Sequence, residues 1–203
     1  MVVLNLTVLF TGSVPSKIYL AMLKKNGFIP KRIIHLKFHT HKTFEQSEKL
    51  VQKELAQIIL EPLEFSYEDT QLNPLDYCTD YTYINIKNLA DAPLKLLLEK
   101  ESCKTFLFTG GGILTKDILS IKNSKFIHIH PGLLPDIKGA DGLFWSYLLK
   151  GKAGYTCFYM NQGIDTGDII YTKEFNLENF DAQRLTHYHI QHVYKAILQS
   201  HDP

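Results

Sequence analysis

Two histidines stand where their side chains could move protons. His128 and His130 are one residue apart in a short apolar run that ends at Pro131 and Gly132. Because side chains alternate between the two faces of a strand, this spacing places both imidazoles on one face. The carboxyl end of a parallel strand is where open α/β sheets bind ligands. An imidazole titrates near neutral pH, so the pair could supply an acid, a base or a hydrogen-bond donor.

A carboxylate lies in a second segment bounded by glycines. Asp165 stands between Gly163 and Gly167, in a stretch expected to be a loop between strands. Glycine there allows a backbone to approach a ligand closely. Turn-forming residues also fill 133–141, which predicts a loop that folds over the same crevice.

Other interpretations of these residues remain open. Isolated histidines are commonly surface or structural residues. A His-x-His pair on one strand can also chelate a metal, with Asp165 as a third ligand. No cysteine stands nearby and no acidic motif has a recognised metal-ligand spacing, so we expect no metal.

The elements that position these residues follow an α/β pattern. Short runs of β-branched and aromatic residues alternate with amphipathic stretches, which predicts a Rossmann-like, doubly wound and mostly parallel sheet. With no repeat or linker, we expect one domain over 1–203. The expected strands are 4–10, 32–36, 81–86, 105–108, 125–130, 155–160 and 169–174, and the expected helices are 16–26, 43–60, 141–149 and 181–199.

Composition limits the partners and the compartment. The 203 residues are 45% hydrophobic and carry a formal net charge of +1, which gives no field for gripping a nucleic acid or an anionic membrane. The cysteines Cys78, Cys103 and Cys157 are widely spaced and form no disulfide framework, which favours a reducing cytoplasm. The apolar start of the chain is too short for a membrane span. The oligomeric state stays open, a homodimer included.

A glycine run follows one of the expected strands. Gly110, Gly111 and Gly112 precede a short expected helix, the arrangement that often cradles phosphate. Neither of the glycine-rich nucleotide-binding patterns is complete here, so the run does not indicate a nucleotide site by itself. A tight turn that binds nothing is the alternative.

The ordered motifs resemble those of a known family. The stretch His130-Pro131-Gly132-Leu133-Leu134-Pro135, then Gly139, then Gly163-Ile164-Asp165-Thr166-Gly167, resembles the signature of the formyltransferase superfamily, whose members use 10-formyltetrahydrofolate. The resemblance is strong over 105–171 and weaker over the N-terminal hundred residues. Two motifs in the right order, separated by a helix and a strand, are more specific than one.

The resemblance implies roles for the site residues. Family members carry a trio of Asn, His and Asp; His130 matches the histidine, Asp165 the aspartate, and His128 occupies the asparagine's position. His130 would handle the proton, Asp165 would hold the ring and raise its pKa, and His128 would donate to the formyl oxygen. The implied folate pocket is lined by Gly111, Gly112, Ile113, Leu114, Met160, Asn161, Gln162, Gly163 and Ile164.

The acceptor implied is the primary amine of a nucleotide-linked amino-deoxy sugar, because the chain is most like the sugar N-formyltransferases. An example is a 4-amino-4,6-dideoxy sugar nucleotide of a surface-glycan or pseudaminic-acid-like pathway. The near-neutral chain, which stops early, is expected not to act on tRNA, and its first loop has a proline where enzymes acting on glycinamide ribonucleotide have a glycine-rich phosphate loop. We interpret Phe144 and Trp145 as core residues rather than acceptor contacts.

Three further alternatives come from the same residues. The acceptor could be another amine, glycinamide ribonucleotide or methionyl-tRNA. The chain could be a non-catalytic folate-binding module, or a metal-dependent hydrolase that uses the His-x-His pair.

Overall fold

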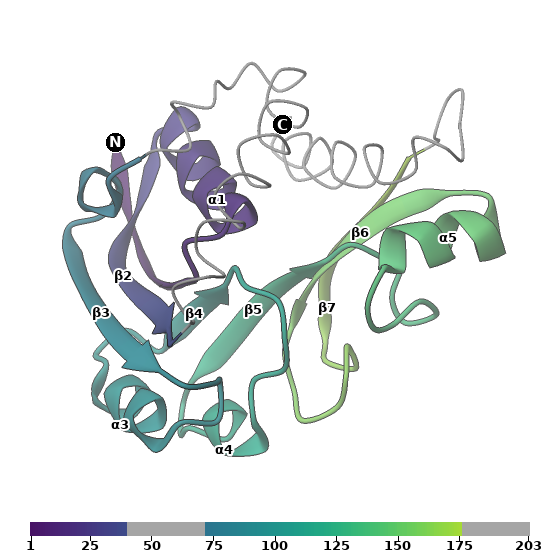
Figure 1. Cartoon of the computed structure of the whole chain (residues 1–203). Coiled ribbons are helices and arrows are strands. Elements are labelled where there is room, and N and C mark those ends of the chain that lie inside the picture. Colours follow the sequence, from purple (N-terminus) through teal and green to yellow (C-terminus); the bar gives the residue numbers. More distant parts are fainter. Residues whose placement is uncertain (40–71, 176–203) are drawn as a thin grey trace. The chain divides into compact units, whose positions relative to one another are not determined.

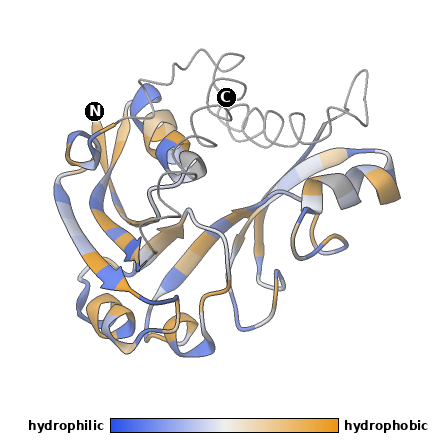
Figure 2. Ribbon diagram, viewed as in Figure 1, coloured by the Kyte–Doolittle hydropathy of each residue, from blue (hydrophilic) through white to orange (hydrophobic). Residues whose placement is uncertain are grey.

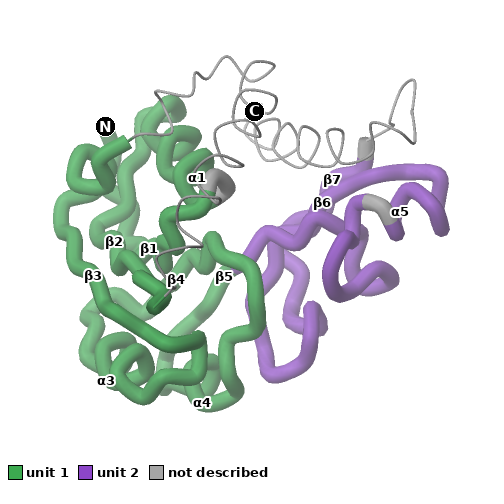
Figure 3. The backbone as a smooth tube through the Cα atoms, in the orientation of Figure 1, with its two compact units in different colours: residues 1–57, 66–127 green, residues 58–65, 128–203 purple. Residues whose placement is uncertain are grey.

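The computed structural model describes residues 1–39 and 72–175 of the chain. They fall into two compact units, which Figure 3 colours separately. Unit 1 comprises residues 1–57 and 66–127, and unit 2 comprises residues 58–65 and 128–203. The predicted helices 43–60 and 181–199 lie outside the described residues. The single domain over 1–203 stays a prediction.

Unit 1 is a parallel sheet with its connecting helices (Figure 1). Its strands run in the order β3-β2-β1-β4-β5, and the four neighbouring pairs are parallel. The chain order reverses between β1 and β4, which is the topological switch point of a doubly wound sheet. The elements are β1 (Val2–Phe10), α1 (Val14–Lys25), β2 (Phe28–Phe38), η3 (Pro74–Tyr77), β3 (Asp80–Ile86), α3 (Ala92–Lys100), β4 (Thr105–Phe108), α4 (Lys116–Leu119) and β5 (Lys125–His130).

Burial along β1 shows why this sheet needs helices on both faces. Thr7, Val8 and Leu9 are 0% exposed and Phe10 is 2% exposed, so neighbouring side chains that point to opposite faces are all buried. A parallel sheet covered on both faces has such continuous apolar strands. The core of unit 1 is therefore built on β1 and on the strands beside it.

The first helix ends before the predicted glycine, Gly27, but begins at Val14, two residues earlier than the sequence predicted. Ser13 caps α1, its side chain accepting a hydrogen bond from the Ser16 amide, and a proline occupies the first turn. Gly27 follows the last turn with a φ of +81°, a left-handed conformation that favours glycine. These signals return the chain to the sheet at β2.

Unit 2 starts within β5 and carries the loop that follows it. Its remaining elements are α5 (Gly142–Lys150), β6 (Ala153–Tyr159) and β7 (Ile169–Phe175). The strand order continues β5-β6-β7, and β6 and β7 are antiparallel. Leu133, Leu143 and Phe158 are among its buried apolar side chains. Figure 2 shows further apolar residues at the C-terminal end of α5.

The predicted fold class is confirmed. Among the described residues, seven strands form a mostly parallel sheet, helical segments connect β1 to β6 in the expected order, and β4 and β5 have the predicted bounds. Helix α3 was not anticipated. Among the described residues, no helix is both long enough and apolar enough to cross a membrane.

Candidate functional site

His130 is the most deeply buried of the three predicted catalytic residues. It ends β5 and is 3% exposed. Its Nε2 atom lies 3.0 Å from the carbonyl oxygen of Ile137, and its Nδ1 atom lies 3.5 Å from Oδ2 of Asp165. The structure therefore brings together the two residues that were predicted to form the acid–base pair, both of them in unit 2.

The carbonyl of Ile137 fixes the position of the ring's hydrogen. A carbonyl oxygen can only accept, so Nε2 must donate and carry the hydrogen. In the neutral ring, Nδ1 then presents its lone pair towards Asp165. A proton can be added at Nδ1 without disturbing the bond from Nε2.

Burial decides whether the pKa of the His130 ring is raised or lowered overall. Burial lowers the pKa of His130 below its ordinary value of 6.5, although Asp165 and the Ile137 carbonyl act to raise it. The sequence led us to expect a raised pKa from the carboxylate alone. The net shift of the pKa is in the opposite direction. Burial destabilises the imidazolium by more than the neighbouring carboxylate stabilises it.

Asp165 is held by the loop that follows β5. Its Oδ2 atom accepts a hydrogen bond from the Gly139 amide at 2.8 Å, and its side chain is 16% exposed against 4% for His130. Its φ of +50° is left-handed, a conformation that aspartate tolerates better than most residues. Asp165 is therefore the member of the pair that solvent or a substrate reaches more easily.

The glycines that flank Asp165 make room for their own chain. A Cβ on Gly167 would lie 1.6 Å from the carbonyl oxygen of Tyr159, and one on Gly163 would lie 2.1 Å from Oγ1 of Thr166. Asn161 organises the same turn, since its Oδ1 accepts from the Gly163 amide at 3.0 Å and from the Thr166 hydroxyl at 2.6 Å. The sequence suggested that these glycines let the backbone approach a ligand closely. In the structure, the atoms that lie close to the glycines belong to Tyr159 and Thr166 of the protein itself.

Two other glycines frame the imidazole. A Cβ on Gly132 would lie 2.5 Å from Nε2 of His130, and a Cβ on Gly142 would lie 2.8 Å from the same atom. Real Cβ atoms are not found at such distances, so both positions require glycine for this ring placement. Sequence reasoning missed Gly142 and the Ile137 carbonyl, because no local pattern shows that the start of α5 meets the end of β5.

His128 lies two residues before His130 on the same strand and is half-buried. Its ring packs edge-on against Phe158 of β6, with ring centroids 6.1 Å apart and an interplanar angle of 78°. The contact places His128 over an apolar side chain of unit 2. Its role as a donor to the formyl oxygen stays a prediction.

The predicted folate-pocket residues are distributed over both units. Gly111, Gly112, Ile113 and Leu114 belong to unit 1, whereas 160–164 belong to unit 2. Ile113 is 67% exposed, whereas Leu114 is 1% exposed, so the Leu114 side chain packs in the core. In unit 2, Ile164 is 55% exposed.

The glycine run of unit 1 is anchored at the switch point. A Cβ on Gly110 would lie 2.5 Å from Cγ2 of Thr11. Ser16, which is 0% exposed, lies 2.7 Å from the hydroxyl of Thr109 and 2.7 Å from that of Thr11. These bonds tie the turn after β1 to the turn after β4, the place where a doubly wound sheet binds ligands.

Within residues 1–39 and 72–175, no three His, Cys, Asp or Glu side chains are grouped as metal ligands. His128, His130 and Asp165 are among the residues searched, so the metal-site alternative gains no support.

The structure corrects the expected burial of one aromatic side chain on α5. Trp145 was expected in the core and is 50% exposed, whereas the Phe144 side chain lies outside the described part of the chain.

Comparison with known proteins gives the same motifs a context. The formyl transferase family model matches residues 95–199, slightly more than half of the 203 residues. A methionyl-tRNA formyltransferase of Clostridioides difficile (strain 630) is 44% identical over 78 residues, which are 37% of this chain. The match spans 25% of that relative's own length.

Solved structures share the fold. A phosphoribosylglycinamide formyltransferase from Streptococcus pneumoniae TIGR4 has a TM-score of 0.58 and 17% identity, covering 96% of this chain and 94% of that one. A sugar N-formyltransferase from Shewanella sp. FDAARGOS_354 has a TM-score of 0.58 and 16% identity, covering 97% of this chain and 67% of that one. At these identities the likeness concerns the fold alone.

Proposed function

Because the chain belongs to the formyl transferase family, we propose that it transfers the formyl group of 10-formyltetrahydrofolate to a primary amine. The observation that carries the proposal is the geometry of His130, whose Nε2 is 3.0 Å from the Ile137 carbonyl while Nδ1 faces Asp165 at 3.5 Å. A buried imidazole with one nitrogen fixed and the other beside a carboxylate is suited to accept and return one proton.

The reaction needs one proton to leave the attacking amine and one to reach the departing folate nitrogen. The bound donor supplies the formyl carbon, to which the amine nitrogen bonds as the bond from that carbon to N10 breaks. Asp165, the more exposed member of the pair, would accept the amine's proton directly or through a water and pass it to Nδ1 of His130. His130 holds the transferred proton at Nδ1, where the carboxylate stabilises the imidazolium, and then releases it to the leaving nitrogen.

Charge that develops on the formyl oxygen needs a hydrogen-bond donor. We assign this role to His128, which shares a strand face with His130. An asparagine amide always donates, whereas an imidazole donates from whichever nitrogen carries hydrogen. The residue therefore preserves the hydrogen bond that the family obtains from asparagine.

Each unit carries part of the predicted folate pocket. In unit 1 the residues proposed are Gly111, Gly112 and Ile113, and in unit 2 they are Met160, Asn161, Gln162, Gly163 and Ile164. In unit 1, Ile113 exposes its apolar side chain and a Cβ on Gly111 would meet no atom within 4 Å, which fits contact with a flat aromatic ring. In unit 2, Ile164 also exposes an apolar side chain. An aromatic ring that covers such side chains removes apolar surface from water.

For the acceptor we propose a nucleotide-linked amino-deoxy sugar. The formal net charge of +1 supports a small acceptor over a nucleic acid. Trp145 supports a nucleotide, because it is 50% exposed and lies within one helical turn of Gly142, the residue beside the His130 ring. An exposed indole offers a face on which a base can stack. Methionyl-tRNA is the second candidate, favoured by the relative that is 44% identical over 78 residues.

The test is a set of parallel incubations with 10-formyltetrahydrofolate. One series contains nucleotide-linked amino sugars with the amine at different ring positions, and two further reactions contain glycinamide ribonucleotide and methionyl-tRNA. Mass spectrometry reads the gain of one formyl group. We expect formylation of a sugar nucleotide; formylation of methionyl-tRNA alone would overturn the acceptor, and no formylation of any amine would overturn the transfer itself.

A further inference from the structure

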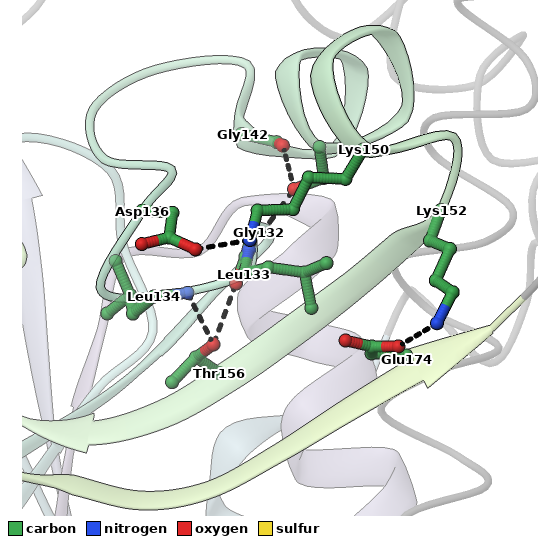
Figure 4. A network of polar contacts seen from close by, with 10 residues as sticks. Gly132, Leu133, Leu134, Asp136, Gly142, Lys150, Lys152, Thr156 and Glu174 are labelled. Carbon is green, nitrogen blue, oxygen red and sulfur yellow. Dashed lines mark hydrogen bonds and ion pairs between the residues drawn. The ribbon is translucent and has the colours of Figure 1, made fainter.

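Thr156 holds the loop that follows β5 through a buried hydroxyl (Figure 4). It lies on β6 and is 0% exposed. Its Oγ1 atom donates to the carbonyl of Gly132 at 2.8 Å and accepts from the amide of Leu134 at 3.1 Å. One hydroxyl thus satisfies two backbone groups of the loop, which would be costly to leave unpaired in a buried site.

Ser146 makes a matching pair of bonds from α5. It is also 0% exposed, and its Oγ atom accepts from the amide of Leu133 at 3.1 Å and donates to the carbonyl of Gly142 at 2.7 Å. The donated bond is the usual one from a helical serine to the carbonyl four residues before it. The accepted bond ties α5 to the loop.

The hydroxyls of Ser146 and Thr156 bind the backbone of Gly142 and Gly132, and these two glycines lie beside the His130 ring. A Cβ on Gly132 or on Gly142 would lie 2.5 Å or 2.8 Å from Nε2, so both glycines leave the ring little space. The Ile137 amide donates to the carbonyl of Leu133 at 2.9 Å, so the acceptor of the Nε2 hydrogen belongs to the same loop. A shift of this loop would turn Nδ1 away from Asp165.

We propose that Ser146 and Thr156 are positioning residues, which act through Gly142 and Gly132 to hold the His130 ring with Nδ1 towards Asp165. Their effect on turnover rests on the proposed formyl transfer. A purely structural role would lower the stability of unit 2 and leave the ring's orientation unchanged in the molecules that fold. Two kinds of measurement separate a positioning role from a purely structural one. The first follows the His130 imidazole itself, and the second asks whether a variant changes kcat or KM.

The kinetic arm uses isosteric and conservative variants of the full chain. Thr156→Val and Ser146→Ala remove the hydroxyls, and Thr156→Ser restores one. Thr172→Val is the matched control, because the Thr172 hydroxyl donates a long hydrogen bond of 3.4 Å to Oγ1 of Thr156 and makes no described bond to the loop itself. We expect roughly ten- to hundredfold lower kcat for Thr156→Val and Ser146→Ala with KM nearly unchanged, since small misplacements of catalytic groups have effects of this size.

The second arm reads the ring without relying on turnover. Nuclear magnetic resonance of the His130 imidazole reports which nitrogen carries the hydrogen and how fast it exchanges with water. We expect a protected Nε2 hydrogen in the wild type and in Thr156→Ser and Thr172→Val. Exchange should be at least about fivefold faster in Thr156→Val and Ser146→Ala, the change expected when support worth about one hydrogen bond is lost.

The outcomes separate the two proposals. Unchanged exchange in folded Thr156→Val and Ser146→Ala would overturn the positioning role, as would equal losses of kcat in Thr156→Ser and Thr156→Val. If Thr156→Val does not fold, Ser146→Ala carries both measurements. A wild type that transfers no formyl group would contradict the proposed function, and the exchange measurements would still decide whether the hydroxyls position the ring.

Discussion

The Nδ1 atom of His130 lies 3.5 Å from Oδ2 of Asp165, and the same carboxylate oxygen accepts the Gly139 amide at 2.8 Å. One oxygen thereby joins two loops of unit 2, the loop after β5 and the loop between β6 and β7. Because the amide bond fixes the carboxylate, the imidazole can gain a proton beside a charge that is already in place. Preorganised charge of this kind is effective because it does not need to reorient during the reaction.

Loss of either member of this pair should nearly abolish turnover. We expect His130→Ala and Asp165→Ala each to lower kcat by at least about a hundredfold, the usual size of positioned proton transfer and charge stabilisation. Asp168→Ala is the control, since it removes an exposed carboxylate three residues from Asp165. Steady-state kinetics on variants with native circular dichroism is the measurement. Near-normal turnover of either site variant would refute the assigned roles.

The lowered pKa of His130 predicts the pH dependence of activity. If unprotonated Nδ1 accepts the proton, kcat/KM should rise with pH through a pKa below 6.5 and be level above it, because burial lowers the pKa of this imidazole. The profile is measured in buffers of constant ionic strength. A rise centred clearly above 6.5 would contradict the idea that burial exceeds the influence of Asp165.

Stability should depend on pH in the same sense. The unfolded state binds the His130 proton more readily, so the contribution of this residue is fully present above pH 6.5 and is lost as pH falls through the lower pKa of the folded state. The pKa of His35 is lowered to about 4 by burial and by Lys37 and Lys17, so it adds a loss of the same sign. Urea unfolding at several pH values should give a shallower pH dependence for His130→Gln than for the wild type.

Gly142→Ala should damage the site because its new methyl group would occupy space held by the ring. That Cβ would lie 2.8 Å from Nε2 of His130 and 2.7 Å from the carbonyl oxygen of Pro131. We expect lower stability and a kcat reduced at least about tenfold, since overpacking displaces buried groups. Gly111→Ala is the matched change, with no atom within 4 Å of its Cβ, and it should keep the wild-type melting temperature. Equal melting temperatures for all three proteins would show that the backbone moves aside.

Local patterns were sufficient for the order of the strands and for bringing His130 and Asp165 together. The strand period placed His130 at the end of β5, and the glycines around Asp165 predicted its loop. The net pKa shift of His130 was not predictable, because it depends on how far the ring is buried. Trp145 was assigned to the core from its residue type, whereas its exposure depends on the orientation of α5 against the strands. The pKa shift of His130 and the exposure of Trp145 both depend on contacts between separate elements of the fold, so local patterns do not predict them.

Exposed Trp145 gives a test of the proposed acceptor. If a nucleotide base stacks on the indole, Trp145→Ala should raise the acceptor's KM by roughly tenfold, because base–aromatic stacking is worth about 1–3 kcal/mol. The folate donor's KM should stay unchanged. Leu149→Ala, which removes a 69% exposed apolar side chain from the same helix, is the control. Equal acceptor KM values for the wild type and Trp145→Ala would remove this support for a nucleotide-linked acceptor.

The last prediction concerns His128, which stands where the family has an asparagine. If His128 donates to the formyl oxygen, His128→Asn should retain substantial activity, because an amide is also a donor. His128→Phe keeps a flat ring for the edge-on contact with Phe158 and removes the donor. It should therefore lower kcat by roughly a hundredfold or more, the usual effect of losing one oxyanion donor.

The contrast between these two variants separates donation from packing. Turnover at saturating donor and acceptor is the measurement, and the melting temperature of each variant shows whether the contact with Phe158 still supports the fold. A packing role predicts the reverse order, with His128→Phe active and stable and His128→Asn weakened by a smaller polar side chain on an apolar ring. If that order is found, the oxyanion donor must be sought elsewhere, and catalysis rests on His130 and Asp165.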